Sequence, residues 1–313
     1  MKKIRMNCTA TLDETFADFL LSRRAKGLAE KTLESYSSQW KAVARHLDTG
    51  TDIAALQKAD LDAMIVSMRD AGLLPNSINS YMRVLKSFFS WCNEQGLTRL
   101  NIPLYKAEET VKETYSDAEL TALLKKPDIR KTTFAEYRDW VIINFFLNCG
   151  SCAATVRAIQ IRDVDLDGGV VFYRHTKNRK AQVIPLCSPM IAILREYGRY
   201  RGGEPTDYLF CTETGTQLTE NGLRQSIARY NMRCGVQKTS IHLFRHTFVR
   251  KYLIDCGGDA FTLQKLLGHS ALAMTKHYCA ICDADLTKNY DNFSPLAQMK
   301  ASGAKIKMSA KGR

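Results

Sequence analysis

The chain lacks any long hydrophobic run. Its longest strongly apolar stretch, VIINFFL at 141–147, is far too short to cross a bilayer. The first residues, MKKIRMNCTATLDETF, are partly basic but no apolar segment follows them, so no secretion signal is predicted. We therefore expect a cytoplasmic protein without a membrane partner.

Acidic residues are in short supply. The 313 residues include 45 Lys and Arg against 32 Asp and Glu, which gives a net charge of +13 and a pI near 9.3. An excess of this size favours a polyanionic partner, and nucleic acid is the leading candidate. Apolar residues make up 45%, which indicates folded domains rather than disorder.

The ten cysteines lack the spacing of a structural zinc motif. Two pairs have CxxC spacing, Cys149–Cys152 and Cys279–Cys282, but they lie much too far apart to form the two halves of one such site. We expect most of the thiols to be small buried groups in a reducing compartment. No metal and no cofactor is predicted.

The first hundred residues carry almost no strand signal. Apolar residues recur at helical spacing in four segments between residues 12 and 95. The charged, aperiodic stretch at 97–111 is typical of a linker. We predict an N-terminal extension at 1–11, a helical domain at 12–96, a linker at 97–111, a second domain at 112–296 and a basic tail at 297–313.

The second domain is predicted to be mostly helical with a small antiparallel sheet. Its first helix should begin at Ser116, because SDAE matches a capping box in which Glu119 reaches back. TTFAEYRDWVIINFFLNCG is typical of a long buried helix. VVFYR and AQVIPL are β-rich runs joined by the polar turn HTKNRK, which predicts a hairpin.

Several residues that could bind a phosphate or take part in catalysis lie between 242 and 278. His242 and Arg245 are three apart and share one face of a predicted helix, where a guanidinium can hold two phosphate oxygens. His269 follows the helix stop LLG, and Tyr278 lies nine residues later. A tyrosine is a candidate nucleophile. Each residue alone is more often structural, so the ordered set carries the hypothesis.

This ordered set resembles the tyrosine recombinase family of phage integrases and Xer-like proteins. The resemblance lies in HLFRHTF, in LLGHSALAMTKHY, in the TKN turn with its VIPL strand, and in DVDLDGG. The N-terminal helices resemble the core-binding, SAM-like domain of that family. The resemblance implies a DNA recombinase or integrase that cuts and rejoins two duplexes, working on a bacterial mobile element and associated with the nucleoid.

The resemblance also implies residue roles. Tyr278 would attack the scissile phosphate and form a 3′-phosphotyrosyl link, and Arg245 would neutralise the transition state. His242 and His269 would donate hydrogen bonds or handle protons. Lys177 would be the general acid, although Arg179 and Lys180 in the same turn leave its assignment open. No ATP or metal is required, because the protein–DNA link conserves the bond energy.

One position departs from the family pattern. Aligning Gly150 and Asp163 with the family places Cys152 where its first catalytic arginine belongs, and Arg157 and Arg162 come later in the chain. A thiol makes no bidentate clamp on a phosphate. By analogy with arginine fingers, we expect a loss of about 10³–10⁵ in rate.

DNA contacts are predicted on two helices and one turn. The predicted residues are Asn76, Ser77, Asn79, Arg83 and Lys86 in the first domain, with Arg179, Arg224 and Arg229 in the second. The partners implied by the resemblance are double-stranded recombination sites and a homotetramer that assembles on paired sites and forms a Holliday junction. The free protein is expected to be a monomer, with an excision factor or a host DNA-bending protein as further partners.

Two alternatives remain open at this point. A DNA-binding protein that has lost catalysis and acts in an architectural or regulatory role would also explain Cys152. A type IB topoisomerase shares the chemistry, but the LGHS segment and the two-domain length favour a recombinase.

Overall fold

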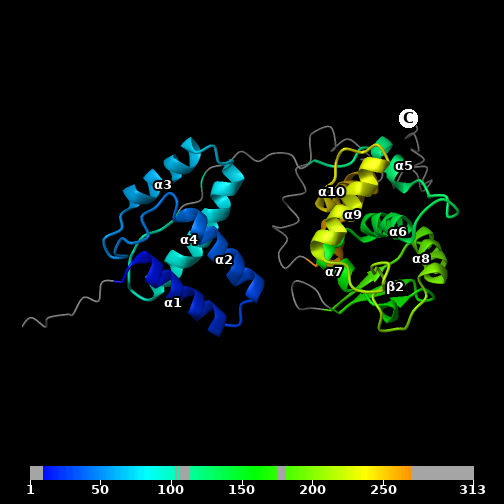
Figure 1. Cartoon of the computed structure of the whole chain (residues 1–313), viewed down its shortest axis with the longest axis horizontal. Coiled ribbons are helices and arrows are strands. Elements are labelled where there is room, and N and C mark those ends of the chain that lie inside the picture. The colour runs from blue at the N-terminus through cyan, green and yellow to red at the C-terminus, as the bar shows by residue number, and fades with distance from the viewer. Residues whose placement is uncertain (1–9, 103–104, 106–112, 175–180, 269–313) are drawn as a thin grey trace, which may run out of the picture. The chain divides into compact units, whose positions relative to one another are not determined.

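The chain divides into two compact units, residues 1–110 and 111–313. The computed structural model describes residues 10–102, 105, 113–174 and 181–268 (Figure 1). None of the helices in these ranges is both long and apolar enough to span a membrane.

Four helices form the first unit, as the sequence predicts. They are α1 (Leu12–Ala25), α2 (Glu30–Val43), α3 (Lys58–Asp70) and α4 (Pro75–Glu94). Thr11 begins α1 through a capping box with Glu14, and Pro75 stands in the first turn of α4, where its missing N–H costs nothing.

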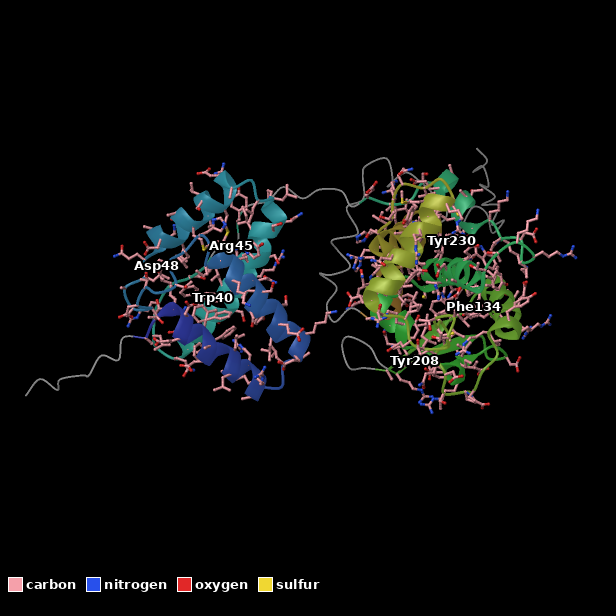
Figure 2. All side chains as sticks on the ribbon, in the orientation of Figure 1. Trp40, Arg45, Asp48, Phe134, Tyr208 and Tyr230 are labelled. Atoms are coloured by element: carbon pink, nitrogen blue, oxygen red, sulfur yellow. The ribbon has the colours of Figure 1, made fainter. Side chains whose placement is uncertain are left out.

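A group of aromatic rings lies within the core of this unit. The Phe16 ring stacks on Trp40 at 4.1 Å between centroids, and Phe88 meets both rings edge-on. Trp40, labelled in Figure 2, also donates its indole N–H to Asp13 Oδ1 at 2.7 Å. These contacts hold α1, α2 and α4 around one apolar centre.

The second unit is mostly helical with a small antiparallel sheet, as predicted. Its helices are α5 (Asp117–Leu124), α6 (Phe134–Cys149), α7 (Ala153–Ala158), α8 (Ser188–Arg201), α9 (Glu220–Arg233), α10 (Ile241–Arg250) and α11 (Ala260–Leu267). A 3₁₀ turn, η1 (Ile161–Asp163), precedes the sheet, and a π-helix, η2 (Lys251–Asp255), continues α10.

The sheet has the order β1–β2–β3. The predicted hairpin is present as β2 (Val170–Tyr173) and β3 (Gln182–Pro185), while β1 (Val164–Asp165) adds a short third strand. The register pairs Val171 with Ile184, and both of these side chains are buried against the helical core.

Helix α6 forms the centre of this unit. It is buried along most of its length, and α8, α9 and α10 pack against it. The predicted capping box of Ser116 and Glu119 is confirmed at the start of α5, and a second one, formed by Thr133 and Glu136, starts α6. The core of α6 thereby supports α10, the helix that carries His242 and Arg245.

Candidate active site

Arg245 lies where three segments of the second unit meet. Its Nη1 donates to the carbonyl of Gly150 at 2.8 Å, and its Nη2 donates to the carbonyl of Leu267 at 3.3 Å. The first carbonyl belongs to the turn between α6 and α7, and the second to the last turn of α11. These bonds fix the plane of a half-buried guanidinium, the group best suited to hold phosphate oxygens in pairs.

The turn at Gly150 is tightly constrained. Gly150 ends α6 in the left-handed conformation (φ 60°), and a Cβ placed there would lie 2.3 Å from Cδ1 of Phe248 on α10. Only glycine meets both requirements. The turn is thereby held close against α10, two residues before Cys152.

Cys152 is the N-cap residue of α7 and is partly exposed. Its Sγ lies 3.1 Å from Oγ1 of Thr155, and its side chain supplies no cap to the helix backbone. The position predicted for the family's first arginine is therefore occupied by a short side chain without a guanidinium, two residues after the carbonyl that Arg245 binds.

The hairpin is attached to the same region. Tyr173 on β2 shares a 2.6 Å hydrogen bond with Ser151, the residue before Cys152. Gln182 on β3 donates to the carbonyl of Lys265 in α11 at 2.9 Å. Lys177 and Arg179 belong to the connection between these strands and lie outside the described residues.

The end of α11 completes the arrangement. Gly268 caps this helix in the left-handed conformation, directly before His269 in the chain. His242 is exposed on α10, one turn before Arg245. His269 and Tyr278 lie outside the described residues, so their predicted roles stay predictions. The turn before Cys152 and the helix end before His269 bond to Arg245, and the hairpin that flanks Lys177 bonds to both of these segments.

The other arginines close to Cys152 in sequence are engaged elsewhere. Arg157 donates from Nε to the carbonyl of Leu218, and Arg162 donates from Nε to Gln160 Oε1. Arg174, which follows β2 and was not among the predicted site residues, pairs with the buried Asp163 of η1. This ion pair joins residues 11 positions apart in the chain, so neither the segment around Asp163 nor the segment around Arg174 predicts it by itself.

The groups behind the turn remain neutral near pH 7. Burial raises the pKa of the Cys149 thiol and raises the pKa of Tyr173 well above its ordinary value. Cys149 donates to the carbonyl of Phe145, one turn earlier in α6. In the part of the chain that the structure describes, no three His, Cys, Asp or Glu side chains gather as a metal site.

Five of the seven predicted DNA-contact residues that the structure describes are exposed. Asn76, Arg83 and Lys86 lie exposed on α4, and Ser77 is half-buried there. Asn79 differs from the prediction, because it is 7% exposed and its Nδ2 donates to the carbonyl of Tyr105 at 2.9 Å. The spacing along α4 does not reveal this use, since the partner is 26 residues away. On α9, Arg224 and Arg229 are exposed.

Comparison with known proteins identifies the family. The model described as the phage integrase family matches residues 114–284, and the model of the phage integrase N-terminal SAM-like domain matches residues 14–96. The chain belongs to the phage integrase family. The predicted family and its class of enzyme, the tyrosine-type site-specific DNA recombinase, are thereby confirmed.

Curated relatives within this family are tyrosine recombinases. XerC from Xanthomonas campestris pv. campestris is 27% identical over 256 residues, which cover 80% of this chain and 77% of the relative. XerD from Staphylococcus haemolyticus is 26% identical over 299 residues and covers 92% of this chain and 99% of the relative.

Solved structures of the family share the fold. The integrase of transposon Tn1549, in complex with a circular intermediate DNA, aligns with a TM-score of 0.75 at 18% identity over 90% of this chain and 99% of its own. A lambda integrase tetramer bound to a Holliday junction aligns with a TM-score of 0.68 at 17% identity over 89% and 81% of the two chains.

Proposed function

We propose that this protein binds a DNA recombination site and cleaves it with Tyr278, and that Cys152 holds this cleavage down. The observation that supports the proposal is that Arg245 bonds to the turn before position 152 and to the end of α11, while the hairpin bonds to both of these segments. This is the set of segments that carries or flanks every residue of the predicted catalytic group before Tyr278.

The proposed reaction is a transesterification that conserves energy. The Tyr278 hydroxyl gives its proton to His242 or His269 and its oxygen bonds to phosphorus. The bond from phosphorus to the 5′-oxygen breaks, and Lys177 gives the leaving oxygen its proton. Arg245, with His242 and His269, stabilises the charge that develops on the phosphate. A 5′-hydroxyl of a second duplex then attacks the phosphotyrosine, which releases Tyr278 and leads to a Holliday junction.

The missing arginine matters mainly for this step. Fixed donors that face developing charge in a water-poor site contribute far more than exposed charges do. DNA affinity, in contrast, draws on many phosphate contacts. Such contacts are available from Arg83 and Lys86 on α4 and from Arg224 and Arg229 on α9, all exposed. The chain should therefore bind its site and cleave it slowly.

Cys152→Arg tests the proposal directly. We expect it to raise the rate of covalent adduct formation on a nicked suicide substrate by about 10³–10⁵ with little change in DNA affinity. Ala154→Arg is the matched control, because it adds the same charge to an exposed position of the same helix. Tyr278→Phe in the Cys152→Arg background should abolish the adduct.

The outcomes separate the candidate functions. An adduct that survives Tyr278→Phe would move the nucleophile to Tyr252 or Tyr290. Tyr252 is the weaker rival, because it packs against Phe248 and the backbone of Gly258, and burial raises its pKa. Tight DNA binding without adduct in Cys152→Arg would favour the architectural or regulatory protein that Cys152 also suggests.

The biological setting belongs to the same proposal. We place the protein in the bacterial cytoplasm, acting on a mobile element, as a monomer that assembles into a tetramer on paired sites. Residues 283–296, outside the described ranges, are proposed to dock on the neighbouring protomer. Deleting 283–313 should then weaken assembly on paired sites more than binding to a single site, and equal losses would contradict docking in trans.

A further inference from the structure

A short segment that follows the interdomain linker lies along α10. Tyr115 donates its backbone N–H to Oγ1 of Thr247, on the second half of α10, at 2.9 Å. Its ring lies 4.5 Å from the ring of Phe244, which is the neighbour of Arg245 in the same helix. Tyr115, Phe244 and Thr247 are all at most 3% exposed. The middle of α10 is thus packed directly on this segment.

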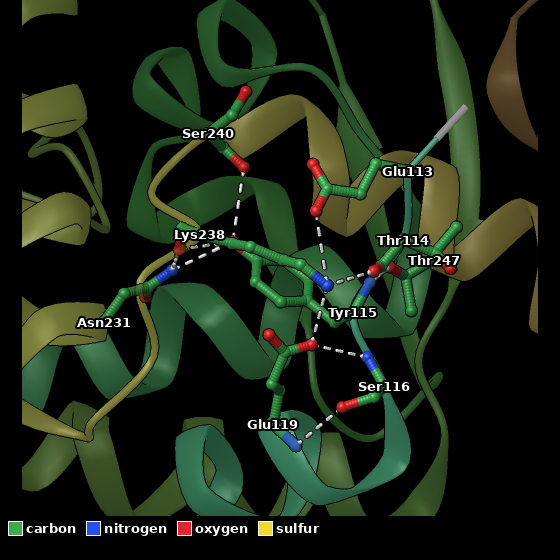
Figure 3. A network of polar contacts seen from close by, with 9 residues as sticks. All are labelled: Glu113, Thr114, Tyr115, Ser116, Glu119, Asn231, Lys238, Ser240 and Thr247. Atoms are coloured by element: carbon green, nitrogen blue, oxygen red, sulfur yellow. Dashed lines mark hydrogen bonds and ion pairs between the residues drawn. The ribbon is translucent and has the colours of Figure 1, made fainter. Parts of the chain in front are cut away.

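The hydroxyl of Tyr115 reaches the start of the same helix. It lies within hydrogen-bonding distance of the carbonyls of Lys238 (3.3 Å) and Ser240 (3.4 Å), which immediately precede α10 (Figure 3). It also accepts a hydrogen bond from Asn231 Nδ2 at 2.9 Å, and the same amide donates to the Lys238 carbonyl. One buried hydroxyl therefore organises the turn from which α10 begins.

The side chain of Lys238 closes the arrangement from the other direction. Its Nζ donates to the carbonyl of Thr114 at 2.9 Å and to Oε2 of Glu119 at 3.0 Å, and Glu113 Oε1 lies 3.4 Å away (Figure 3). Glu119 also accepts the backbone N–H of Ser116 at 2.7 Å. The carboxylate that caps α5 therefore also fixes the residue that leads into α10.

Beyond α10 the contact continues. Lys251, the first residue of η2, donates from Nζ to Asp117 Oδ1 at 2.5 Å. The segment 113–117 thus contacts the approach to α10, its middle and its far end. A phenylalanine at position 115 would fill the same apolar space, so packing alone does not account for the hydroxyl, whose burial is costly without partners.

We infer that Tyr115 and Lys238 are positioning residues for DNA cleavage, which act by holding α10 and hence Arg245 and His242 in place. This inference rests on the proposed function. Neither residue is among the predicted catalytic or DNA-contact residues. Errors of about 1 Å in the placement of catalytic groups cost up to about a hundredfold in rate, and the first turn of α10 carries His242.

The test uses the full chain with Cys152→Arg as the parent. Tyr115→Phe removes only the hydroxyl, and Tyr230→Phe is its matched control. Tyr230 is also buried in this unit, and its hydroxyl contacts the carbonyl of Leu123 rather than the approach to α10. We expect Tyr115→Phe to slow adduct formation at saturating DNA on the order of tenfold to a hundredfold, with DNA affinity unchanged within about threefold. Tyr230→Phe should cleave at the parent rate.

Lys238 offers a conservative rescue. Lys238→Met should slow cleavage as Tyr115→Phe does, whereas Lys238→Arg, which can keep the ion pair with Glu119, should restore most of the rate. If Tyr115 had a merely structural role, both Tyr115→Phe and Tyr230→Phe would lower the melting temperature. At a temperature where both variants are folded, their cleavage rates would then be the same.

Two failures are distinguishable. If the Cys152→Arg parent forms no adduct, the proposed function is wrong and this inference falls with it. If the parent forms the adduct and Tyr115→Phe cleaves as fast as Tyr230→Phe, the positioning role alone is overturned.

Discussion

The cores of the two units differ in how many polar residues they bury. In the described part of the first unit, only Thr15 and Asn79 are buried polar residues, and the core consists of aliphatic side chains around a group of stacked and edge-on aromatic rings. The second unit buries a larger polar set: Arg138, Asp139, Ser151, Thr155, Asp163, Ser226, Asn231 and Thr247. Apolar packing is non-directional, whereas hydrogen bonds fix distance and angle. Buried hydrogen bonds, which are directional, are therefore concentrated in the second unit, where the relative positions of catalytic groups must be fixed.

The largest effect should come from breaking the buried ion pair of the second unit. Arg138 and Asp139 side chains are 5% and 6% exposed, and both also bond to Ser226. Asp139→Ala leaves a buried guanidinium without its anion, which should cost about 3–5 kcal/mol in that unit. This loss of stability can be measured by urea unfolding followed by tryptophan fluorescence. The fluorescence of Trp140 follows unfolding of the second unit, and that of Trp40 and Trp91 follows unfolding of the first.

A double replacement sharpens this prediction. Arg138→Met with Asp139→Leu removes both charges and should cost less than Asp139→Ala alone, because no unpaired charge stays buried. A Trp140→Phe chain isolates the signal of the first unit, which should not change. A shift in that signal would mean that the two units do not unfold independently.

A smaller effect is expected in the aromatic core of the first unit. Phe88 contacts the rings of Phe16, Trp40 and Phe89. Phe88→Leu keeps an apolar side chain of similar size, so the loss should be about 1–2 kcal/mol. A loss as large as that of Asp139→Ala would show that ring geometry, and not apolar volume, holds this core.

Equal and still smaller effects should follow from the helix caps. Thr11 caps α1 in the first unit and Thr133 caps α6 in the second, each with a glutamate three residues later. Thr11→Ala and Thr133→Ala should each cost about 1 kcal/mol in its own unit. Unequal losses would indicate that the cores alter the strength of a local cap.

The smallest effect is the acid dependence of these caps. Hydrogen bonds from Thr11 lower the pKa of Glu14 below its ordinary value of 4.5. The pKa of Glu136 is also lowered, mainly by a hydrogen bond from the side chain of Thr132. A lowered folded pKa stabilises the fold above pH 4.5, and this contribution is lost as pH falls through the folded pKa. Glu14→Gln and Glu136→Gln should each reduce the acid sensitivity of one unit, measured as the urea midpoint between pH 6 and about pH 3. An unchanged pH profile would contradict the lowered pKa values.

Local features of the fold were predictable from the sequence. The helix periods, the Ser116 cap and the hairpin all depend on residues within one or two turns of each other. Strand β1 was missed, because two residues carry no period and its pairing with β2 supplies the only signal.

The site was predictable to a smaller extent. The catalytic set came from the resemblance to the family, not from spacing alone. The meeting of Gly150 with Arg245 joins residues 95 positions apart, and the burial of Asn79 depends on Tyr105, so neither is contained in a local pattern. The roles of Lys177, His269 and Tyr278 stay predictions.

The hydrogen bond from Asn79 to Tyr105 has a consequence for binding kinetics. It fixes Tyr105, inside the predicted linker, on α4, while the backbone N–H of Tyr115, just after the linker, bonds to α10. Only seven residues, 106–112, separate Tyr105 from Glu113 along the chain. If both units contact DNA, as we propose, then once one unit is bound the other experiences a local DNA concentration in about the millimolar range. Dissociation then requires both units to release within the same short interval, so residence on DNA should fall steeply when the linker is lengthened.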